Sequence, residues 1–334
     1  MSTNAEIINA ILSDAGYEDR FPTATEENYK KIGTMIIDQP NVKNDFINTL
    51  TNKIGLTAFL TKVYSNPLKG FKKGNLPYGQ TIEQIFTDII KAKDYTQLQD
   101  DNVATEVLAK ADENPVKVAY KSENFRHKYK ITVSIVQLTK AFQTKNGLST
   151  LVNELVAVPV NSAEYDEYLQ LKGLVDAASY SKEVIVADPT SSGGAKALVK
   201  SLRTYARKLA FLSTKYNKMG VHTFSKAEDL HIITTPEVEA ELDVELLAQV
   251  FNISKAEVPT RMTIVDSFGD KDRVAVLVDK DFIQYYTTLT ESRNQENPAT
   301  LYNNVWYHVW GLVAQCDFAN AIDFRTKPQS EMEI

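Results

Sequence analysis

The chain of 334 residues contains a single cysteine, Cys316, and therefore cannot form an internal disulfide. It has no apolar run close to the roughly 18 residues that a membrane-spanning helix needs. Its first residues, MSTNAEIINA, show neither the charged start nor the long apolar stretch of a signal peptide. We therefore expect a soluble intracellular product in a reducing compartment, without a membrane partner.

Positive charge is also in short supply. The 37 Lys and Arg residues are outnumbered by 43 Asp and Glu residues, which gives a formal charge of −6. Nucleic-acid-binding domains usually have a strong basic excess, so this balance argues against a dedicated nucleic-acid binder. The 43% of hydrophobic residues are enough for a sizeable core, in one large domain or in two to three smaller ones.

A complete phosphate-binding motif is missing as well. The run EVIVADPTSSGGAKALVKS predicts a strand, a loop and a helix, which is the context of a Walker A motif. That motif needs Gly-Lys-Ser/Thr, but Ala195 separates Gly194 from Lys196, and Ala197 replaces the hydroxyl residue. An anion at the helix start, next to Gly193 and Gly194, stays open as the basis of an alternative function: an α/β enzyme that binds a phosphorylated ligand.

Other catalytic and metal-binding patterns are equally weak. Cys316 follows His308 by eight residues, and we interpret it as a buried, inert thiol rather than as half of a Cys–His pair. The four histidines do not have the spacing of metal ligands; they are His127, His222, His231 and His308. We predict no enzyme activity, no catalytic residue, no metal and no cofactor.

What the chain does contain is a β-rich C-terminal segment from Asp270 to Arg325. Valines alternate with Ala and Leu from Val274 to Val278, and a second run from Val305 to Val313 holds both tryptophans, Trp306 and Trp310. Runs that are apolar on both faces are typical of strands covered on both sides. We therefore expect the closing strands of a core, with the tryptophans as packing residues.

The N-terminal part, residues 1–60, is polar with two short helical patterns. Apolar residues recur at helical spacing from Ala5 to Leu12 and from Asn44 to Leu60. Neither segment has enough apolar surface for a core of its own. Two interpretations stay open: helices packed on the main domain, or an arm that reaches across a neighbouring subunit.

The next segment predicts an exposed, extended excursion. Asn66 to Tyr78 combines prolines, glycines and three lysines, which indicates turns. The apolar spacing from Thr81 to Ile90 favours a helix, although a strand stays possible. Alternation predicts strands at Val116–Tyr120 and Tyr129–Ile135 with a turn over 122–128 between them, so we expect a basic, hairpin-like arm.

A long helical region follows the excursion. Apolar residues at i, i+3, i+4, i+7 and i+8 begin at Leu148. We expect Pro159 to interrupt the helix, and Asn161 to cap a new one with Glu164 as its capping-box partner. A short strand, Glu183 to Ala187, then leads into the next unit.

Residues 188–269 have the pattern of a mixed α/β unit. Helices are predicted at Ala195–Ser213 and Pro236–Phe251, and strands at His231–Thr234 and Met262–Asp266. No acidic residue occurs from Pro189 to Ala227, whereas Glu228 to Glu245 is strongly acidic. These opposed patches could form a ring contact between copies; solvated helix faces or pairing within one subunit remain as alternatives.

The order of these segments resembles the major capsid protein of tailed bacteriophages, with the Hong Kong 97-type fold. DLHIITTPEVEAELDVELLAQVFN resembles a buried strand that ends in Thr-Thr-Pro and starts a helix. MTIVDSF with AVLVDKDFIQYY, and NNVWYHVWGLVAQCDFANAIDF, resemble the returning and terminal strands. KYKITVSIVQLTKAF and GLSTLVNELV resemble the second arm of the extended loop and the start of the spine helix.

The resemblance implies an α+β architecture of four parts. Residues 1–60 correspond to an N-terminal arm and 61–141 to an extended β loop. Residues 142–187 and 270–334 correspond to a peripheral domain with a spine helix and β-sheet, and 188–269 to an α/β axial domain. Some family members cross-link a lysine to an asparagine, but no motif here identifies such a pair.

The implied function is a shell protein that self-assembles into hexamers and pentamers, forming an icosahedral or prolate head around double-stranded DNA. Scaffolding, portal and decoration proteins are the implied partners, and the virion, assembled in the host cytoplasm, is the implied location. An encapsulin-type compartment stays open as an alternative. Candidate intersubunit contacts are Lys69, Lys72, Lys73, Arg126, Lys128, Lys130, Arg203, Arg207, Glu237 and Glu241.

Overall fold

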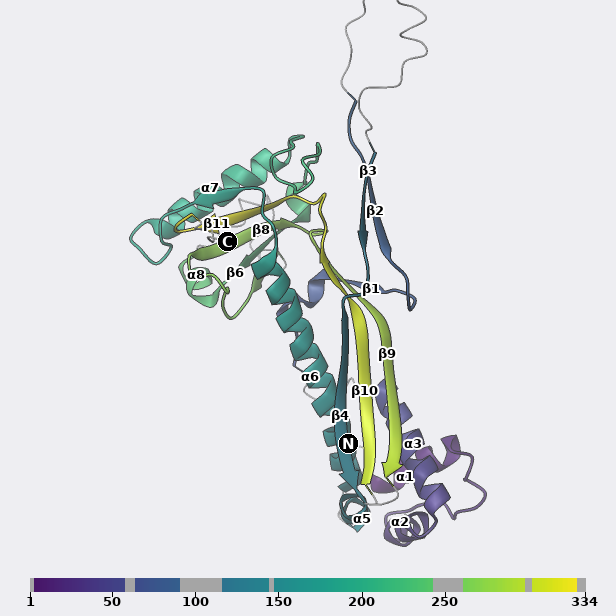
Figure 1. Ribbon diagram of the computed structural model, residues 1–334. Helices are drawn as coiled ribbons and strands as arrows, with labels where there is room; N and C mark the ends of the chain where they lie inside the picture. The colour runs from purple at the N-terminus through teal and green to yellow at the C-terminus, as the bar shows by residue number, and fades with distance from the viewer. Residues whose placement is uncertain are drawn as a thin grey trace, which may run out of the picture.

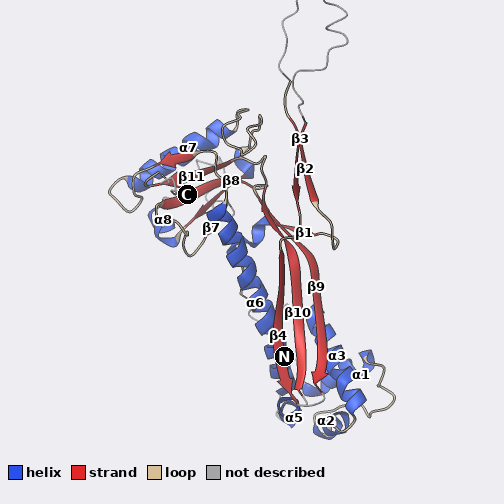
Figure 2. Ribbon diagram, in the orientation of Figure 1, coloured by secondary structure: helices blue, strands red, loops and turns tan. Residues whose placement is uncertain are grey.

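The computed structural model describes residues 3–57, 64–90, 116–143, 147–242, 261–297 and 302–328. A long four-stranded sheet runs beside a long helix, with a group of helices at one end and a smaller α/β body at the other (Figure 1). A two-stranded hairpin projects away from both bodies. Helices and strands therefore mix as Figure 2 shows, and the predicted α+β class is confirmed.

The long sheet is built around the two longest C-terminal strands. Its order is β1 (Lys72–Asn75), β9 (Ile283–Asn297), β10 (Tyr302–Gln315) and β4 (Phe125–Ser134). β10 pairs antiparallel with both β9 and β4, and a bulge falls between Trp310 and Gly311. Glycine is required there, because a Cβ on Gly311 would lie 2.4 Å from the carbonyl oxygen of Tyr286.

Helix α6 (Gly147–Ala177) covers one face of this sheet, where the Tyr129 hydroxyl donates to Asp166 at 2.7 Å. The predicted break at Pro159 is wrong, because the helix runs through it. Proline removes one backbone hydrogen bond, but Pro159 is buried and the rest of a 31-residue helix holds the turn in place. Asn161 does not cap a helix; its side-chain oxygen accepts from the Tyr64 N–H at 2.8 Å.

The opposite face of the sheet is only partly covered by the described residues, among them Tyr78, whose ring lies 5.5 Å from that of Trp310. Trp306 and Trp310 lie on it and are only partly buried. The Lys130 ammonium lies 5.4 Å from the Trp306 ring, and the Arg126 guanidinium 4.6 Å from the Trp310 ring. The prediction that the C-terminal strands are covered on both sides is therefore wrong for β10, and the tryptophans are not simple packing residues.

Helices at the far end pack on the chain itself. They are α1 (Asn4–Asp14), α2 (Tyr29–Ile37), α3 (Pro40–Thr57) and α5 (Ile135–Gln143). Thr3 and Glu6 form a capping box at the start of α1. Their core is shared, since Phe142 and Leu148 from α5 and α6 are buried with Phe46 of α3. Apolar surface that the N-terminal segment lacks is thus supplied by residues about a hundred positions later.

The projecting hairpin pairs β2 (Ile82–Thr87) with β3 (Val116–Lys121), after a short 3-10 turn at Pro67–Phe71. Two predictions are wrong here. The helix favoured over Thr81–Ile90 is a strand, and the two predicted arm strands do not pair with each other, because β4 pairs with β10. The isoleucines at positions 82 and 85 fit the spacing of a helix as well as that of a strand. Pairing with β3 decides that this segment is a strand.

The smaller body is a five-stranded sheet in the order β5, β11, β8, β6, β7. The strands are Glu183–Ile185, Ala321–Arg325, Arg273–Asp279, Leu230–Thr234 and Met262–Ile264. Helices α7 (Gly194–Leu209) and α8 (Pro236–Glu241) share one core with this sheet. A single 3-10 turn, Ala227–Asp229, precedes β6. The helix predicted from Pro236 to Phe251 is wrong at Leu242, because α8 ends at Glu241 and Leu242 is extended with ψ 127°. Residues 243–251 lie outside the described residues.

The C-terminal segment connects the two sheets. β8 and β11 lie inside the five-stranded sheet, whereas β9 and β10, between them in sequence, belong to the long sheet. A division at 269/270 would therefore cut through the smaller sheet, and the four-part boundaries stay a prediction. No helix among the described residues is long and apolar enough to cross a membrane.

Candidate functional site

The Gly193–Gly194 loop has a structural explanation. Gly193 has φ +82°, and a Cβ on Gly194 would lie 1.8 Å from the carbonyl oxygen of Asp188. That same carbonyl accepts from the Ser191 N–H at 2.9 Å and from its hydroxyl at 2.6 Å. Both glycines are therefore needed to let the loop close on itself before α7 begins.

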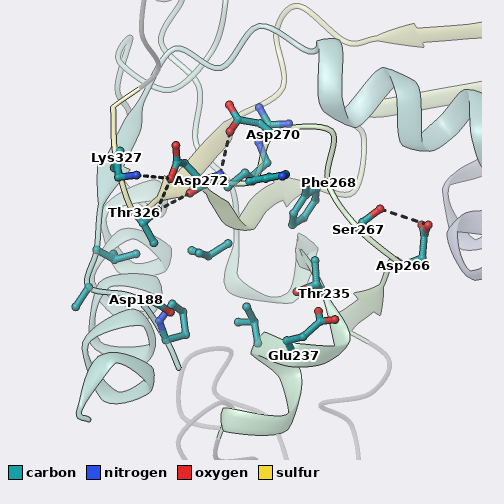
Figure 3. Close-up of a pocket in the computed structure, with 17 residues that line it drawn as sticks. Asp188, Thr235, Glu237, Asp266, Ser267, Phe268, Asp270, Asp272, Thr326 and Lys327 are labelled. Atoms are coloured by element: carbon teal, nitrogen blue, oxygen red, sulfur yellow. Dashed lines mark hydrogen bonds and ion pairs between the residues drawn. The ribbon is translucent and has the colours of Figure 1, made fainter. Parts of the chain in front are cut away.

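A hollow of about 680 Å³ lies where the smaller body meets the chain after β11 (Figure 3). Several charges on its wall are neutralised inside the chain: Asp272 pairs with Lys327 at 3.5 Å, and Asp270 pairs with Arg325. Bonds from Lys172 and Tyr168 lower the pKa of Asp266, a further lining residue, to about 2. Among the described residues, no group of three or more His, Cys, Asp or Glu is placed to hold a metal ion.

Cys316 sits directly after β10 and is partly buried. Burial raises the pKa of its thiol above the usual value. A nucleophilic cysteine needs the opposite shift, because the thiolate is the reactive form. The geometry gives this cysteine the character of an unreactive thiol.

The β2–β3 hairpin is fixed to the body along one face. Gln84 donates to Gln284 at 2.7 Å, and Lys121 pairs with Asp317 at 2.7 Å. The ring of Phe86 stacks on that of Phe318 with centroids 5.4 Å apart. The Lys117 ammonium donates to the carbonyl oxygen of Met219 at 3.0 Å, and the His222 ring lies 2.9 Å from the Asp88 carboxylate. These contacts run along the described part of the hairpin and fix its direction relative to the rest of the subunit.

The other face of the hairpin is exposed and mostly apolar, with Glu83 accepting a hydrogen bond from the Tyr120 hydroxyl at 2.9 Å. Ile85 lies directly opposite Val118 across the strand pair, and they are 61% and 38% exposed. Val116 and Tyr120 extend the same face, with 43% and 69% of their surface exposed. A two-stranded hairpin with one apolar face uncovered is a candidate contact surface, because exposed apolar patches mark interaction sites.

The three lysines of the Asn66–Tyr78 turn are occupied within the subunit. Lys69 pairs with Glu164 at 3.4 Å, and Lys73 pairs with Asp281 at 2.6 Å. Lys72 pairs at 3.0 Å with Glu167, a buried carboxylate. Their assignment as intersubunit contacts stays a prediction, and Lys72 has a clear internal role beside it.

The predicted contacts on β4 share the partly covered face of the long sheet. Arg126, Lys128 and Lys130 are exposed at every second position, next to the two tryptophans. Arg126 also pairs with Glu123 at 2.5 Å. The structure brings these three cations together on one surface, and their assignment as intersubunit contacts stays a prediction.

The last group of predicted contacts lies on the smaller body. Arg203 and Arg207 are exposed on α7, and Glu237 and Glu241 are exposed on α8. Sequence reasoning did not find the exposed face of β2–β3. The alternation of Val116, Val118 and Tyr120 along VKVAYK was the available signal, but the helical interpretation of the partner strand β2 concealed it.

Known proteins with similar sequences and folds are phage capsid proteins. A family model described as "Phi29-like phage major capsid protein" matches residues 8–325. The major capsid protein of Bacillus phage PZA is 38% identical over 328 residues, which cover 96% of this chain and 72% of that protein. That of Bacillus phage B103 is 35% identical over 329 residues, with the same coverage of 96% and 72%.

Solved structures agree on the fold. A chain from the capsid structure of Staphylococcus phage Andhra matches with a TM-score of 0.61 at 15% identity, over 80% of this chain and 86% of that one. The long helix α6, the long sheet, the α/β body and the hairpin thus have the Hong Kong 97-type fold of capsid proteins. The chain belongs to the family of Phi29-like phage major capsid proteins.

Proposed function

We propose that this chain builds the head shell of a phage by assembling into hexamers and pentamers that enclose double-stranded DNA. Its role is mechanical and not enzymatic: hairpins and helices contact neighbouring subunits, and many weak contacts add up through multivalency. The formal charge of −6 suits a shell that surrounds DNA without gripping it. Assembly in the host cytoplasm, with scaffolding, portal and decoration proteins as partners, belongs to the same proposal.

The observation that carries this proposal is the two-sided hairpin. One face of β2–β3 is tied to its own subunit by Gln84, Lys121 and Asp88, whereas Ile85, Val118 and Tyr120 stay uncovered. A fixed direction lowers the entropy cost of binding a neighbour. The exposed apolar side chains would gain most from being covered by a second copy.

A double variant, Ile85→Asp with Val118→Lys, tests this role, because the two opposite charges face each other across the strand pair and do not repel. We expect the variant subunit to keep the urea midpoint of the wild type, since both side chains are exposed, but to form shells at least tenfold less efficiently in sedimentation assays. The matched control is Ile85→Leu with Val118→Ile, which keeps the surface apolar and should assemble normally. Full assembly of the charged variant would contradict the proposal.

An encapsulin-type compartment would use the same contacts but enclose a different cargo. Neighbouring genes separate the two: portal and terminase genes indicate a phage head, and an enclosed enzyme with a docking tail indicates a compartment. The family match favours the phage head.

A further inference from the structure

Helix α7 carries an exposed stripe of positive charge. Lys196, Lys200, Arg203 and Arg207 are spaced four, three and four residues apart, so they follow one side of the helix. All four are exposed, while Leu198 and the other apolar residues of α7 are buried against the sheet. Eleven residues at 1.5 Å each give the stripe a length of about 16 Å.

Helix α8 carries the opposite charge on the same layer of the body. Glu237 and Glu241 are four residues apart, exposed, and therefore on one side of the helix. Asp229 and Glu228 precede β6 nearby in the chain. The helix contains no basic residue, and Glu237 also lines the hollow shown in Figure 3.

The two helices cover different halves of the five-stranded sheet. Tyr205 of α7 contacts Phe324 of β11 with ring centroids 6.0 Å apart, whereas α8 follows directly on β6. β11 and β6 are separated by β8 in the strand order. In Figure 1, α7 lies along the β11 end of the smaller body and α8 lies at its β6 end. The layer that the two helices share therefore has a basic end and an acidic end.

Five of the charges on α7 and α8 have no charged partner inside the described part of the subunit. Within the part of the chain that the structure describes, Lys196, Lys200 and Arg207 pair with no carboxylate, and Glu237 and Glu241 pair with no cation. Other charges of the same body do pair, among them Lys280 with Asp229 at 2.6 Å. The fold therefore leaves these five side chains without a charged partner among the described residues of the same subunit.

We propose that the α7 stripe of one copy contacts the acidic side of α8 in the next copy, head to tail, within each ring of the shell. A contact between two different patches of the same chain closes into a ring when the rotation between copies allows it. Exposed charge pairs contribute little stability each, but they orient the partners and speed encounter. This inference rests on the proposed shell function and assigns its ring contact.

Charge reversal on one side alone should break the contact. Lys200→Glu with Arg207→Glu places two carboxylates on the α7 stripe, opposite the acidic side of the next copy. Glu237→Lys with Glu241→Lys places two cations on α8, opposite the stripe. We expect each double variant to lower the rate of assembly, followed by light scattering, by tenfold or more at low salt. The wild-type rate should itself fall as salt rises, since exposed charges are screened beyond about 8–10 Å at physiological ionic strength.

Combining the four substitutions in one chain restores complementarity and should restore assembly. Mixing the two double variants in equal amounts should give alternating rings, which close only with an even number of copies. Hexamers would therefore form and pentamers would not, an outcome that mass spectrometry of isolated rings can read. Neither result follows from a change of net charge alone.

The control for Lys200→Glu with Arg207→Glu is Lys31→Glu with Lys140→Glu. These two exposed lysines lie at the other end of the molecule, and their reversal changes the net charge by the same amount. Circular dichroism and urea unfolding check the fold, and Lys200→Gln with Arg207→Gln provides a milder variant. Equal assembly of all variants, or equal impairment of the control, would overturn the α7–α8 contact while leaving the shell function intact. Failure of the wild type to assemble would instead overturn the shell function.

Discussion

The Asp323 carboxylate accepts two hydrogen bonds from the guanidinium of Arg273, both at 3.0 Å, in the interior of the five-stranded sheet. Arg325 donates to the same carboxylate at 3.1 Å and pairs with Asp270. Arg273 also donates to the carbonyl oxygen of Val175 at the end of α6. This buried network therefore joins the spine helix to the smaller body.

Replacing Asp323 by Asn should destabilise the subunit strongly. The change leaves Arg273 and Arg325 buried without their shared counter-ion, and breaking such a pair costs about 3–5 kcal/mol. The free energy of unfolding in urea measures this effect on the unassembled subunit. Asp272→Asn is the control, because its pair with the exposed Lys327 should contribute about 1 kcal/mol or less.

His231 should make stability depend on pH. Burial lowers the pKa of this histidine to about 4, from about 6.5 in the unfolded chain. Between these values the unfolded state binds a proton that the folded state does not, so stability is complete above pH 6.5 and falls as the pH drops toward 4. The loss is on the order of 3 kcal/mol.

The check is the difference between the wild type and His231→Gln in urea unfolding from pH 7 to pH 4. The variant should lose less stability over this range, although carboxylates titrate in both proteins. His231→Asn is a second variant without a titratable group at this position and should show the same reduced loss. Identical slopes for His231→Gln and wild type would refute the assignment.

Gly194→Ala should destabilise the protein by several kcal/mol, because the new Cβ would overlap the Asp188 carbonyl oxygen. The matched control is Gly173→Ala in α6, where nothing lies within 4 Å and helix propensity predicts a gain of about 0.5–1 kcal/mol. Thermal unfolding compares the two. If Gly194→Ala kept full stability but calorimetry showed loss of nucleotide binding, the phosphorylated-ligand alternative would gain support, as it would if Lys196→Ala abolished such binding.

The three turn lysines should divide into two kinds. Lys72 lies between the buried Glu167 and the ring of Tyr285, at 5.2 Å from its centroid, so Lys72→Glu should lower subunit stability by bringing two carboxylates together. Lys69→Glu with Lys73→Glu affects only partly exposed pairs and should leave the urea midpoint within about 1 kcal/mol of wild type.

If Lys69 and Lys73 contact neighbouring subunits, that double variant should still impair shell formation in sedimentation assays. Normal shells from it would remove both residues from the set of predicted contacts. The triple variant would not distinguish the two effects, because Lys72 changes the subunit itself.

Local patterns predicted the smaller body well. Three of its elements follow from short-range apolar periodicity and from the turn residues next to them. They are the buried strand that includes Val276, the strand that ends at Thr234, and the start of α7. The long sheet was harder, because β4 and β10 are about 170 residues apart and each could pair elsewhere. Pairing at that distance is decided by the whole fold and not by either strand.

The candidate contact surfaces show the same limit. Charge runs on α7 and α8 are visible in the sequence because helical spacing places residues four apart on one side. The exposed face of β2–β3 was hidden, since Ile82 and Ile85 fit a helix as well as a strand. The partly covered face of the long sheet was misjudged because Trp306 packs against Lys130, and Trp310 packs against Arg126 and Tyr78, instead of a second layer.

Electron microscopy of the purified chain tests the central claim most directly. The protein should form closed shells, or sheets of five- and six-membered rings, under at least one assembly condition, including coexpression with a scaffolding protein. Monomers or small particles under every condition tried would contradict the claim that this chain builds a capsid shell.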